Sequence, residues 1–227
     1  MKIQAFNPFL PSYEYIPDAE PYVFGSRVYV YGSHDRFDGE DFCMNDYVCW
    51  SAPIDDLGAW KKERVIYRSV QDPLNEDGTQ HLFAPDVQVG EDGRYYLFYC
   101  LHRSSTVSVA VCDEPAGEYQ FYGHIHYADG ILYGQKQGDV FNFDPGVLKD
   151  DDGRIYLYTG LSYLKDAPMR KYLAGMFQID GSYCVELDKD MLTLKSEPVL
   201  AVPGEVLAEG TDFEGHGFFE ASSPRKI

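Results

Sequence analysis

The chain has 227 residues, of which 44% are hydrophobic and 15% aromatic. That is enough apolar surface to form the core of one large domain or two small ones, which argues against disorder. Thirty-seven acidic residues against nineteen Lys and Arg residues give a net charge of −18, and such a charge repels phosphate backbones and anionic lipid surfaces. We therefore expect no nucleic-acid partner and no membrane partner.

The sequence shows no export or membrane signal and no disulfide pattern. The first residues lack an apolar stretch long enough for a signal peptide, and no window approaches the roughly 20 apolar residues of a spanning helix. This predicts a cytoplasmic protein. The cysteines are odd in number, lack a CxxC pair and lack the spacing of a zinc site, so we expect free thiols in the core. They are Cys43, Cys49, Cys100, Cys112 and Cys184.

Alternating aromatic and β-branched residues run along most of the chain and favour sheet over helix. The expected elements follow in chain order. A first hairpin starts at Asp18 ("DAEPYVFGSRVYVYGS"), and residues 47–60 then form a strand, a loop and a closing Trp. A second hairpin starts at Asp86 ("DVQVGEDGRYYLFYC"), and residues 107–123 form a strand and a turn. A third hairpin starts at Asp144 ("DPGVLKDDDGRIYLYTG"), residues 166–174 form a short peripheral helical turn, and a fourth copy starts at Glu220 ("EASSPRKI").

These hairpins are copies of one unit, in which an acidic residue precedes a short apolar strand, a turn and a Tyr-rich strand. The Asp-Gly pairs predict two-residue hairpin turns. The copies begin roughly 60 to 75 residues apart, a period that suits propeller blades of four strands. In a propeller the first strand of each blade lines the central axis, so acids far apart in sequence would converge at one end of it. The sequence thus predicts an all-β propeller.

Three acids head their copies without an evident local partner: Asp18, Asp144 and Glu220. A single such acid more often caps a turn or is solvated. Three in register must tolerate mutual repulsion, which is typical of sites that use shifted pKa values. Two carboxylates facing each other across a sugar are the working parts of most glycoside hydrolases, and a third raises the pKa of the proton donor by like-charge repulsion.

Four segments, "IPDAEPYVFGSRVYVYGSHD", "FAPDVQVGEDGRYYLFYC", "FDPGVLKDDDGRIYLYTG" and "FFEASSPRKI", resemble successive segments of glycoside hydrolase family 43. The resemblance implies a five-bladed β-propeller that hydrolyses arabinose- or xylose-containing saccharides with inversion. It implies that Asp18 is the general base, that Asp144 orients the acid and raises its pKa, and that Glu220 is the general acid. In an inverting enzyme the base and the acid stand roughly 6.5 to 9.5 Å apart.

Other residues are candidates for the sugar pocket. Asp86 occupies the matching place in its copy and is interpreted as structural, with contact to substrate as the less favoured alternative. Phe83, His34 and Asp35 are predicted to line the pocket or to lie just behind it.

No metal ligands are assigned, and the chemistry requires no cofactor. His124 and His126 share one face of a strand, where a solvated pair is favoured over a metal site. A structural central ion, as in many family members, is allowed only in a full-length protein.

The chain departs from the family pattern in length. A complete propeller of this family needs about 300 residues, and this chain ends seven residues after Glu220. We expect residues 1–227 to form a single, incomplete propeller domain of about four blades that lacks the C-terminal blade. Open sheet edges invite pairing, so self-association with weak or absent activity is predicted.

Two alternatives stay open. One is a non-catalytic propeller that binds carbohydrate, because a fold does not fix a function. The other is a sucrose- or fructan-cleaving relative, whose usual Glu-Cys acid segment is not present because Ala221 follows Glu220.

Overall fold

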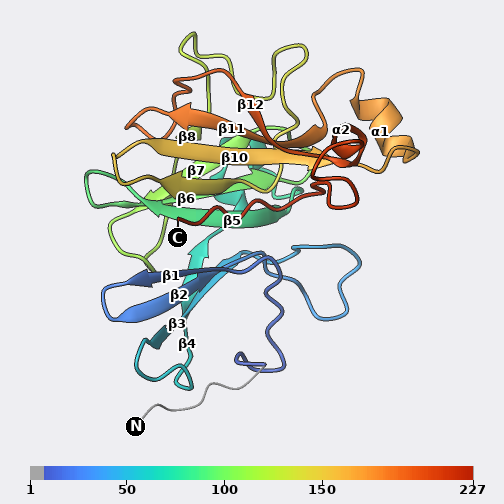
Figure 1. Cartoon of the computed structure of the whole chain (residues 1–227). Helices are drawn as coiled ribbons and strands as arrows, with labels where there is room; N and C mark the ends of the chain where they lie inside the picture. The colour runs from blue at the N-terminus through green and yellow to red at the C-terminus, as the bar shows by residue number, and fades with distance from the viewer. Residues whose placement is uncertain (1–7, 227) are drawn as a thin grey trace. The chain divides into compact units, whose positions relative to one another are not determined.

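The computed structural model describes residues 8–226 and is built almost entirely from strands. The described chain divides into two compact units. Unit 1 comprises residues 8–97 and 110–122, and unit 2 comprises residues 98–109 and 123–226. Each unit is described by itself. Three four-stranded antiparallel sheets account for all the strands of the described chain (Figure 1).

The first sheet lies in unit 1 and has the strand order β1-β2-β3-β4. Its strands are β1 (Glu20–Phe24), β2 (Arg27–Tyr31), β3 (Tyr47–Pro53) and β4 (Lys61–Tyr67). Strand β3 is buried at every position but its last, whereas β1 alternates between exposed and half-buried residues. A central strand covered on both faces loses the polar alternation that an edge strand keeps.

The second sheet has the order β5-β6-β7-β8, and the residues of its last three strands are divided between the units. Its strands are β5 (Leu82–Val89), β6 (Tyr95–Leu101), β7 (Val107–Cys112) and β8 (Gln120–His124). Two single-turn 3₁₀ helices precede it in unit 1, over Ser69–Gln71 and Pro73–Asn75. The third sheet lies in unit 2 and has the order β12-β11-β10-β9. Its strands are β9 (Gly146–Lys149), β10 (Ile155–Ser162), β11 (Asp180–Leu187) and β12 (Val199–Pro203).

Among the described residues, α-helix is confined to two short pieces of unit 2. Helix α1 (Pro168–Leu173) falls within the predicted helical turn, and α2 (Glu205–Ala208) was not predicted. No described helix has both the length and the apolar character that crossing a lipid bilayer requires. The three predicted hairpins are confirmed as β1-β2, β5-β6 and β9-β10. Of the fourth copy, the described part contains no regular strand.

The predicted two-residue turn is wrong for both Asp-Gly hairpins, whereas the first hairpin, which has no Asp-Gly pair, does have a two-residue turn. Phe24 pairs directly with Arg27. In the second hairpin, by contrast, the Gly90 amide bonds the Arg94 carbonyl, which leaves three loop residues, and Gly93 ends the loop with φ 80°. This is a three-residue hairpin loop closed by a left-handed glycine, a common alternative to the two-residue turn.

The third hairpin repeats the same loop. The Asp150 amide bonds the Arg154 carbonyl and Gly153 has φ 83°. The aspartate before each glycine accepts the following arginine's backbone amide at 3.0 Å, and that arginine lies over the ring of the tyrosine two residues on, at 5.6 and 5.5 Å in the two copies. The Asp-Gly-Arg-x-Tyr repeat is therefore structural.

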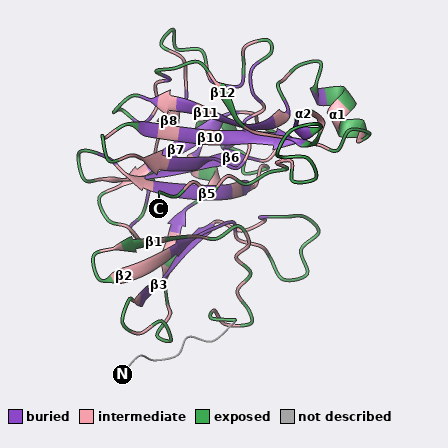
Figure 2. Cartoon of the chain, viewed as in Figure 1, coloured by how far each residue is buried: buried purple, intermediate pink, exposed green. Residues whose placement is uncertain are grey.

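Strands hold most of the buried residues and the loops most of the exposed ones (Figure 2). The core is rich in tyrosine, and the fully buried members include Tyr31, Tyr47, Tyr99, Tyr119 and Tyr133. All five cysteines are free; three are buried and two are half-buried, and burial raises the pKa of the Cys49 thiol. The prediction of free core thiols is thus confirmed for the three buried cysteines.

Candidate active site

Asp18 stands two residues before β1 in a backbone conformation with φ 53°. Its segment lies against the end of β2, where Gly32 provides the room. A Cβ atom at position 32 would come within 2.6 Å of Ile16 Cγ2 and 2.8 Å of the Pro17 carbonyl oxygen. Glycine at this position therefore allows the close approach of the segment that presents Asp18.

The surroundings of Asp18 disfavour its charged form. Solvent reaches the residue, yet the surrounding protein desolvates the carboxylate and raises its pKa. A long hydrogen bond from Ser33 Oγ, at 3.5 Å, acts in the opposite direction, and the charge of Asp35 raises the pKa further. Two acids close enough to interact, in protein that partly excludes water, are typical of a site that handles protons.

Asp35 interacts electrostatically with Asp18, and His34 precedes Asp35 in the chain. That these two residues line a sugar pocket stays a prediction. Asp35 accepts a hydrogen bond from the Cys43 amide at 2.7 Å, which fixes its carboxylate. His34 donates from Nδ1 to the Asp46 carbonyl at 2.9 Å. That bond leaves Nε2 facing Glu14, whose Oε2 atom is 3.7 Å away.

Glu14 is a residue of this site that the sequence did not reveal. Its side chain is only 6% exposed, and it accepts hydrogen bonds from Trp50 Nε1 at 3.0 Å and from Lys62 Nζ at 2.9 Å. Burial on its own raises the pKa of Glu14, but the hydrogen bonds from Lys62 and Trp50 outweigh it, so the pKa lies below its usual value. Glu14 ties the segment that carries Asp18 to β3 and β4.

Asp86 and Phe83 have structural partners within unit 1. Asp86 lies inside β5, is 1% exposed, and accepts a 2.5 Å hydrogen bond from the Tyr22 hydroxyl on β1. The Phe83 carbonyl accepts a hydrogen bond from the Tyr47 hydroxyl, and the residue is half-buried. These contacts agree with the structural interpretation of Asp86, and whether either residue touches substrate stays a prediction.

Asp144 repeats the geometry of Asp18 in unit 2. It stands two residues before β9 with φ 46°, but it is only 7% exposed. Phe143 just before it is fixed to β10, because its amide bonds Thr159 Oγ1 at 2.9 Å and its carbonyl accepts from the Gly160 amide at 3.1 Å. These two hydrogen bonds fix the backbone just before Asp144 to the end of β10.

The residue before Glu220 is fixed to the same strand, two residues farther along. The Phe219 carbonyl accepts from the Ser162 amide at 2.8 Å, two residues along the strand from Gly160. Amides two residues apart on a strand point the same way and are separated by roughly 6.6 Å. The residues that precede Asp144 and Glu220 are thus anchored side by side on one strand edge.

The Glu220 side chain is exposed and lies near Tyr163, the residue after β10. Burial raises the pKa of the Tyr163 hydroxyl, and the negative charge of Glu220 raises it further. Glu220 is therefore an exposed carboxylate near the same end of β10 as buried Asp144.

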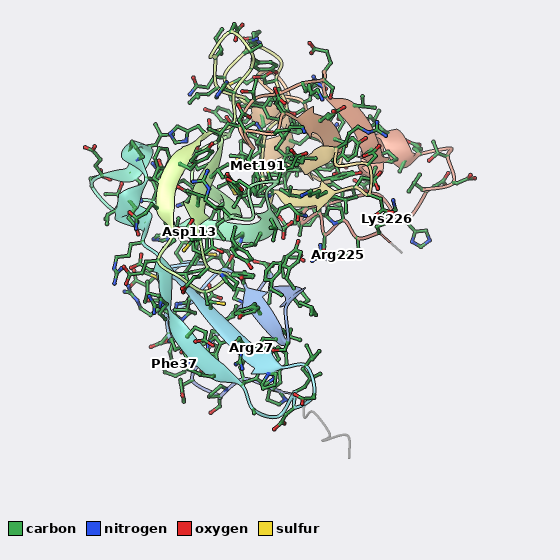
Figure 3. All side chains as sticks on the ribbon, turned by 90° about the vertical axis from the view of Figure 1, so that its left-hand side faces the viewer. Arg27, Phe37, Asp113, Met191, Arg225 and Lys226 are labelled. Atoms are coloured by element: carbon green, nitrogen blue, oxygen red, sulfur yellow. The ribbon has the colours of Figure 1, made fainter. Side chains whose placement is uncertain are left out.

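The chain after Glu220 runs along β9. Ala221 has φ 63°, and the Ser222 hydroxyl lies 2.9 Å from that of Ser182 on β11. At Gly146 a Cβ atom would come within 2.2 Å of the Ser222 carbonyl oxygen. Farther on, Lys226 (labelled in Figure 3) pairs with Asp150 at 2.5 Å. These contacts fix Glu220 from its C-terminal side.

The predicted solvated histidine pair is not found. His124 and His126 are half-buried, and each has its own partner. His124 Nδ1 lies 2.9 Å from the Ser108 hydroxyl, and His126 Nδ1 donates to the Tyr127 carbonyl at 2.9 Å.

Most of the described chain matches one protein family. The model for "Glycosyl hydrolases family 43" matches residues 7–220, so the chain belongs to glycoside hydrolase family 43. It is 56% identical over 226 residues to a xylosidase/arabinosidase of Thermoclostridium stercorarium, and 29% identical over 234 residues to a xylosidase/arabinosidase of Bacteroides ovatus.

The match covers all of this chain but only 46% of the Thermoclostridium protein, and 92% of this chain but 66% of the Bacteroides protein. The chain thus spans about half to two thirds of these relatives' length.

Solved structures show the same fold. A family 43 β-xylosidase/α-arabinofuranosidase from a compost metagenome, solved with xylotriose, superimposes with a TM-score of 0.71 at 24% identity. The match covers 99% of this chain and 70% of that one. A family 43 enzyme of Xanthomonas citri gives a TM-score of 0.67 with 92% of this chain covered. The chain is therefore an incomplete five-bladed β-propeller, of which the described residues form three complete four-stranded sheets.

Proposed function

We propose that this chain carries the acid–base groups of a glycoside hydrolase that cleaves arabinose- or xylose-containing saccharides with inversion. The observation that carries the proposal is the anchoring of Phe143 and Phe219 to neighbouring amides of β10. It gives Asp144 and Glu220 adjacent starting points, which suits a buried carboxylate that modulates an exposed proton donor.

In the proposed reaction Asp18 takes a proton from a water molecule as the water oxygen bonds the anomeric carbon. The glycosidic carbon–oxygen bond breaks, and Glu220 gives its proton to the departing oxygen. The raised pKa of Asp18 strengthens it as a base, provided that it stays ionised at the working pH. The charge of Asp144 would keep Glu220 protonated. The mechanism requires that the carboxyl groups of Asp18 and Glu220 stand roughly 6.5 to 9.5 Å apart in the working enzyme.

The substrate class is proposed from the names of the relatives. Two of them are called xylosidase/arabinosidase, and the structural neighbour was solved with xylotriose. Pentose-containing oligosaccharides are therefore the first substrates to test.

The test measures hydrolysis of aryl arabinofuranosides, aryl xylosides and xylo-oligosaccharides by the wild-type protein and by Glu220→Gln. If Glu220 is the acid, Glu220→Gln slows oligosaccharide cleavage far more than cleavage of an aryl glycoside with an acidic leaving group, which needs little protonation. The matched control is Asp152→Asn, which changes an exposed turn acid. Equal losses on both substrates would contradict the assignment.

The anomer first formed, followed by proton NMR, tests inversion separately. A product that keeps the substrate's configuration would exclude the general-base role of Asp18.

The alternative of a carbohydrate-binding propeller is tested on the same sample. Titration calorimetry with xylo- and arabino-oligosaccharides reports binding, and the hydrolysis assay reports turnover. Binding without turnover by a protein as long as the relatives would favour this alternative.

A further inference from the structure

Two aromatic side chains lie in contact on the surface of unit 1, in the segments that flank Asp18. Phe37 is 76% exposed and Tyr15 is 37% exposed, yet their ring centroids are only 5.9 Å apart, with the planes tilted by 31°. Single exposed apolar residues are common and need no explanation. A paired aromatic surface left open to water is less easily explained by folding alone, because neither ring is buried by the contact.

The pair is tied to Asp18 through Asp35. Tyr15 precedes Asp18 by three residues, and its carbonyl accepts a hydrogen bond from the Asp35 amide at 2.9 Å. Asp35 interacts electrostatically with Asp18. Phe37 follows Asp35 by two residues, on the loop after β2 (labelled in Figure 3). Both rings therefore project from the two segments that position the candidate base.

The loop that carries Phe37 is held in one conformation by internal hydrogen bonds. The Asn45 amide bonds the His34 carbonyl at 3.0 Å, and the Asn45 side chain bonds the Asp35 carbonyl at 2.8 Å. The Gly39 amide bonds the Arg36 carbonyl at 3.0 Å, which closes a turn around Phe37. Because the loop is already ordered, a ligand that contacts Phe37 pays little conformational entropy.

We propose that Tyr15 and Phe37 form a platform for a second sugar ring of the oligosaccharide, next to the sugar at Asp18. Aromatic faces pack against the apolar face of a sugar ring, while the ring's hydroxyl groups need polar partners at the edges. Exposed Arg36 and Asp38, on either side of Phe37, supply charged groups there. This inference rests on the proposed function, because it takes the occupant to be a longer piece of the same substrate.

The test compares binding of xylose and xylotriose by titration calorimetry. Phe37→Ala is expected to weaken xylotriose binding about three- to tenfold, the usual worth of one aromatic packing contact, and to leave xylose binding unchanged. Phe37→Tyr keeps the ring and should keep the affinity. The matched control is Tyr172→Ala, which removes a ring that is 69% exposed on α1, in unit 2. Its xylotriose affinity should equal that of the wild type.

The outcomes separate the platform from the proposed function. If Phe37→Ala leaves xylotriose binding unchanged, or weakens xylose equally, the platform is wrong while the hydrolase proposal stands. If Tyr172→Ala weakens binding as much as Phe37→Ala, the effect is not specific and the platform is also wrong. If the wild-type protein hydrolyses xylo-oligosaccharides but binds xylobiose no more tightly than xylose, a second-ring site is likewise excluded. If it neither binds nor cleaves either sugar, both proposals fail together.

Discussion

Asp18 and Asp86 head the first two copies of the repeat, yet unit 1 places them in different settings. Asp86 lies inside β5, is buried, and accepts the Tyr22 hydroxyl. Asp18 stands ahead of β1 with φ 53°, is reached by solvent, and interacts with the charge of Asp35. An acid within the strand serves the fold, whereas one held two residues before it remains available for chemistry.

Asp144 sharpens this comparison, because it combines the two settings. It has the left-handed backbone of Asp18 and the burial of Asp86. Aspartate adopts this conformation more readily than most residues, but at a cost, and such strain tends to be kept at functional sites. Backbone position therefore separates Asp18 and Asp144 from Asp86 better than burial does.

The largest expected effect is a loss of activity when Asp18 is replaced, which replacement of Asp86 should not cause. Under the proposed mechanism, Asp18→Asn lowers kcat about 1,000-fold, because loss of a general base typically costs 10²- to 10⁴-fold. Steady-state kinetics on xylo-oligosaccharides measures this. Asp86→Asn, which keeps an acceptor for Tyr22, is the control and should retain most of its rate per folded molecule. A full-length Asp18→Asn enzyme with most of its rate would exclude Asp18 as the base.

The same Asp18→Asn variant should not lose stability, and at neutral pH it should melt slightly higher. Desolvation raises the pKa of Asp18 in the folded state, so the charged form opposes folding. Protonated Asp18 therefore adds to the free energy of unfolding. This contribution is fully present below the unfolded pKa of about 3.9 and is lost as pH rises through the folded pKa. Melting curves at pH 4 and pH 7 should therefore show the gain only at the higher pH.

The next largest expected effect is a loss of stability when Asp86 is replaced. Asp86→Ala removes a buried carboxylate and the hydrogen bond that it accepts from the Tyr22 hydroxyl, which should cost about 3 kcal/mol of unfolding free energy. Denaturant unfolding measures it. Tyr22→Phe removes the same bond from the other side and should cost less, about 1 kcal/mol. If Asp86→Ala were as stable as the wild type, the structural assignment of Asp86 would be wrong.

A smaller loss is expected at Glu14, which holds the Asp18 segment in place. Glu14→Ala leaves Trp50 Nε1 and Lys62 without their acceptor, so a cost of about 2 kcal/mol is expected. Because the pKa of Glu14 is lowered on folding, its ionised form adds stability above the unfolded pKa of about 4.3. That contribution is lost as pH falls through the folded pKa.

The difference between Glu14→Ala and wild-type melting temperatures should therefore shrink in acid. A difference that stays constant from pH 7 to pH 3 would show that the charge of Glu14 is not what stabilises the segment.

Much of the fold could be predicted from sequence, because the information was local. Alternating Tyr and Val residues predicted the three hairpins, and Asp-Gly marked the turns of two of them. Turn length was missed for the Asp-Gly copies, since the same dipeptide serves two- and three-residue loops. Glu14 was missed because its partners Trp50 and Lys62 lie 36 and 48 residues away, and nothing local in the sequence marks such a pairing. The neighbouring anchors of Asp144 and Glu220 on β10 also depend on contacts between distant segments.

The smallest expected effect comes from glycine substitutions, at Gly93 in the turn after β5 and at Gly32 beside the Asp18 segment. Gly93 closes the turn after Asp86's strand with φ 80° and nothing within 4 Å of an added Cβ atom. Gly93→Ala should cost about 1 kcal/mol through backbone conformation alone, without affecting sugar hydrolysis. At Gly32 the added methyl group would instead meet Ile16 and the Pro17 carbonyl. Gly32→Ala should therefore displace the Asp18 segment and lower activity in the folded protein. If both variants lost only stability, Gly32 would not position Asp18.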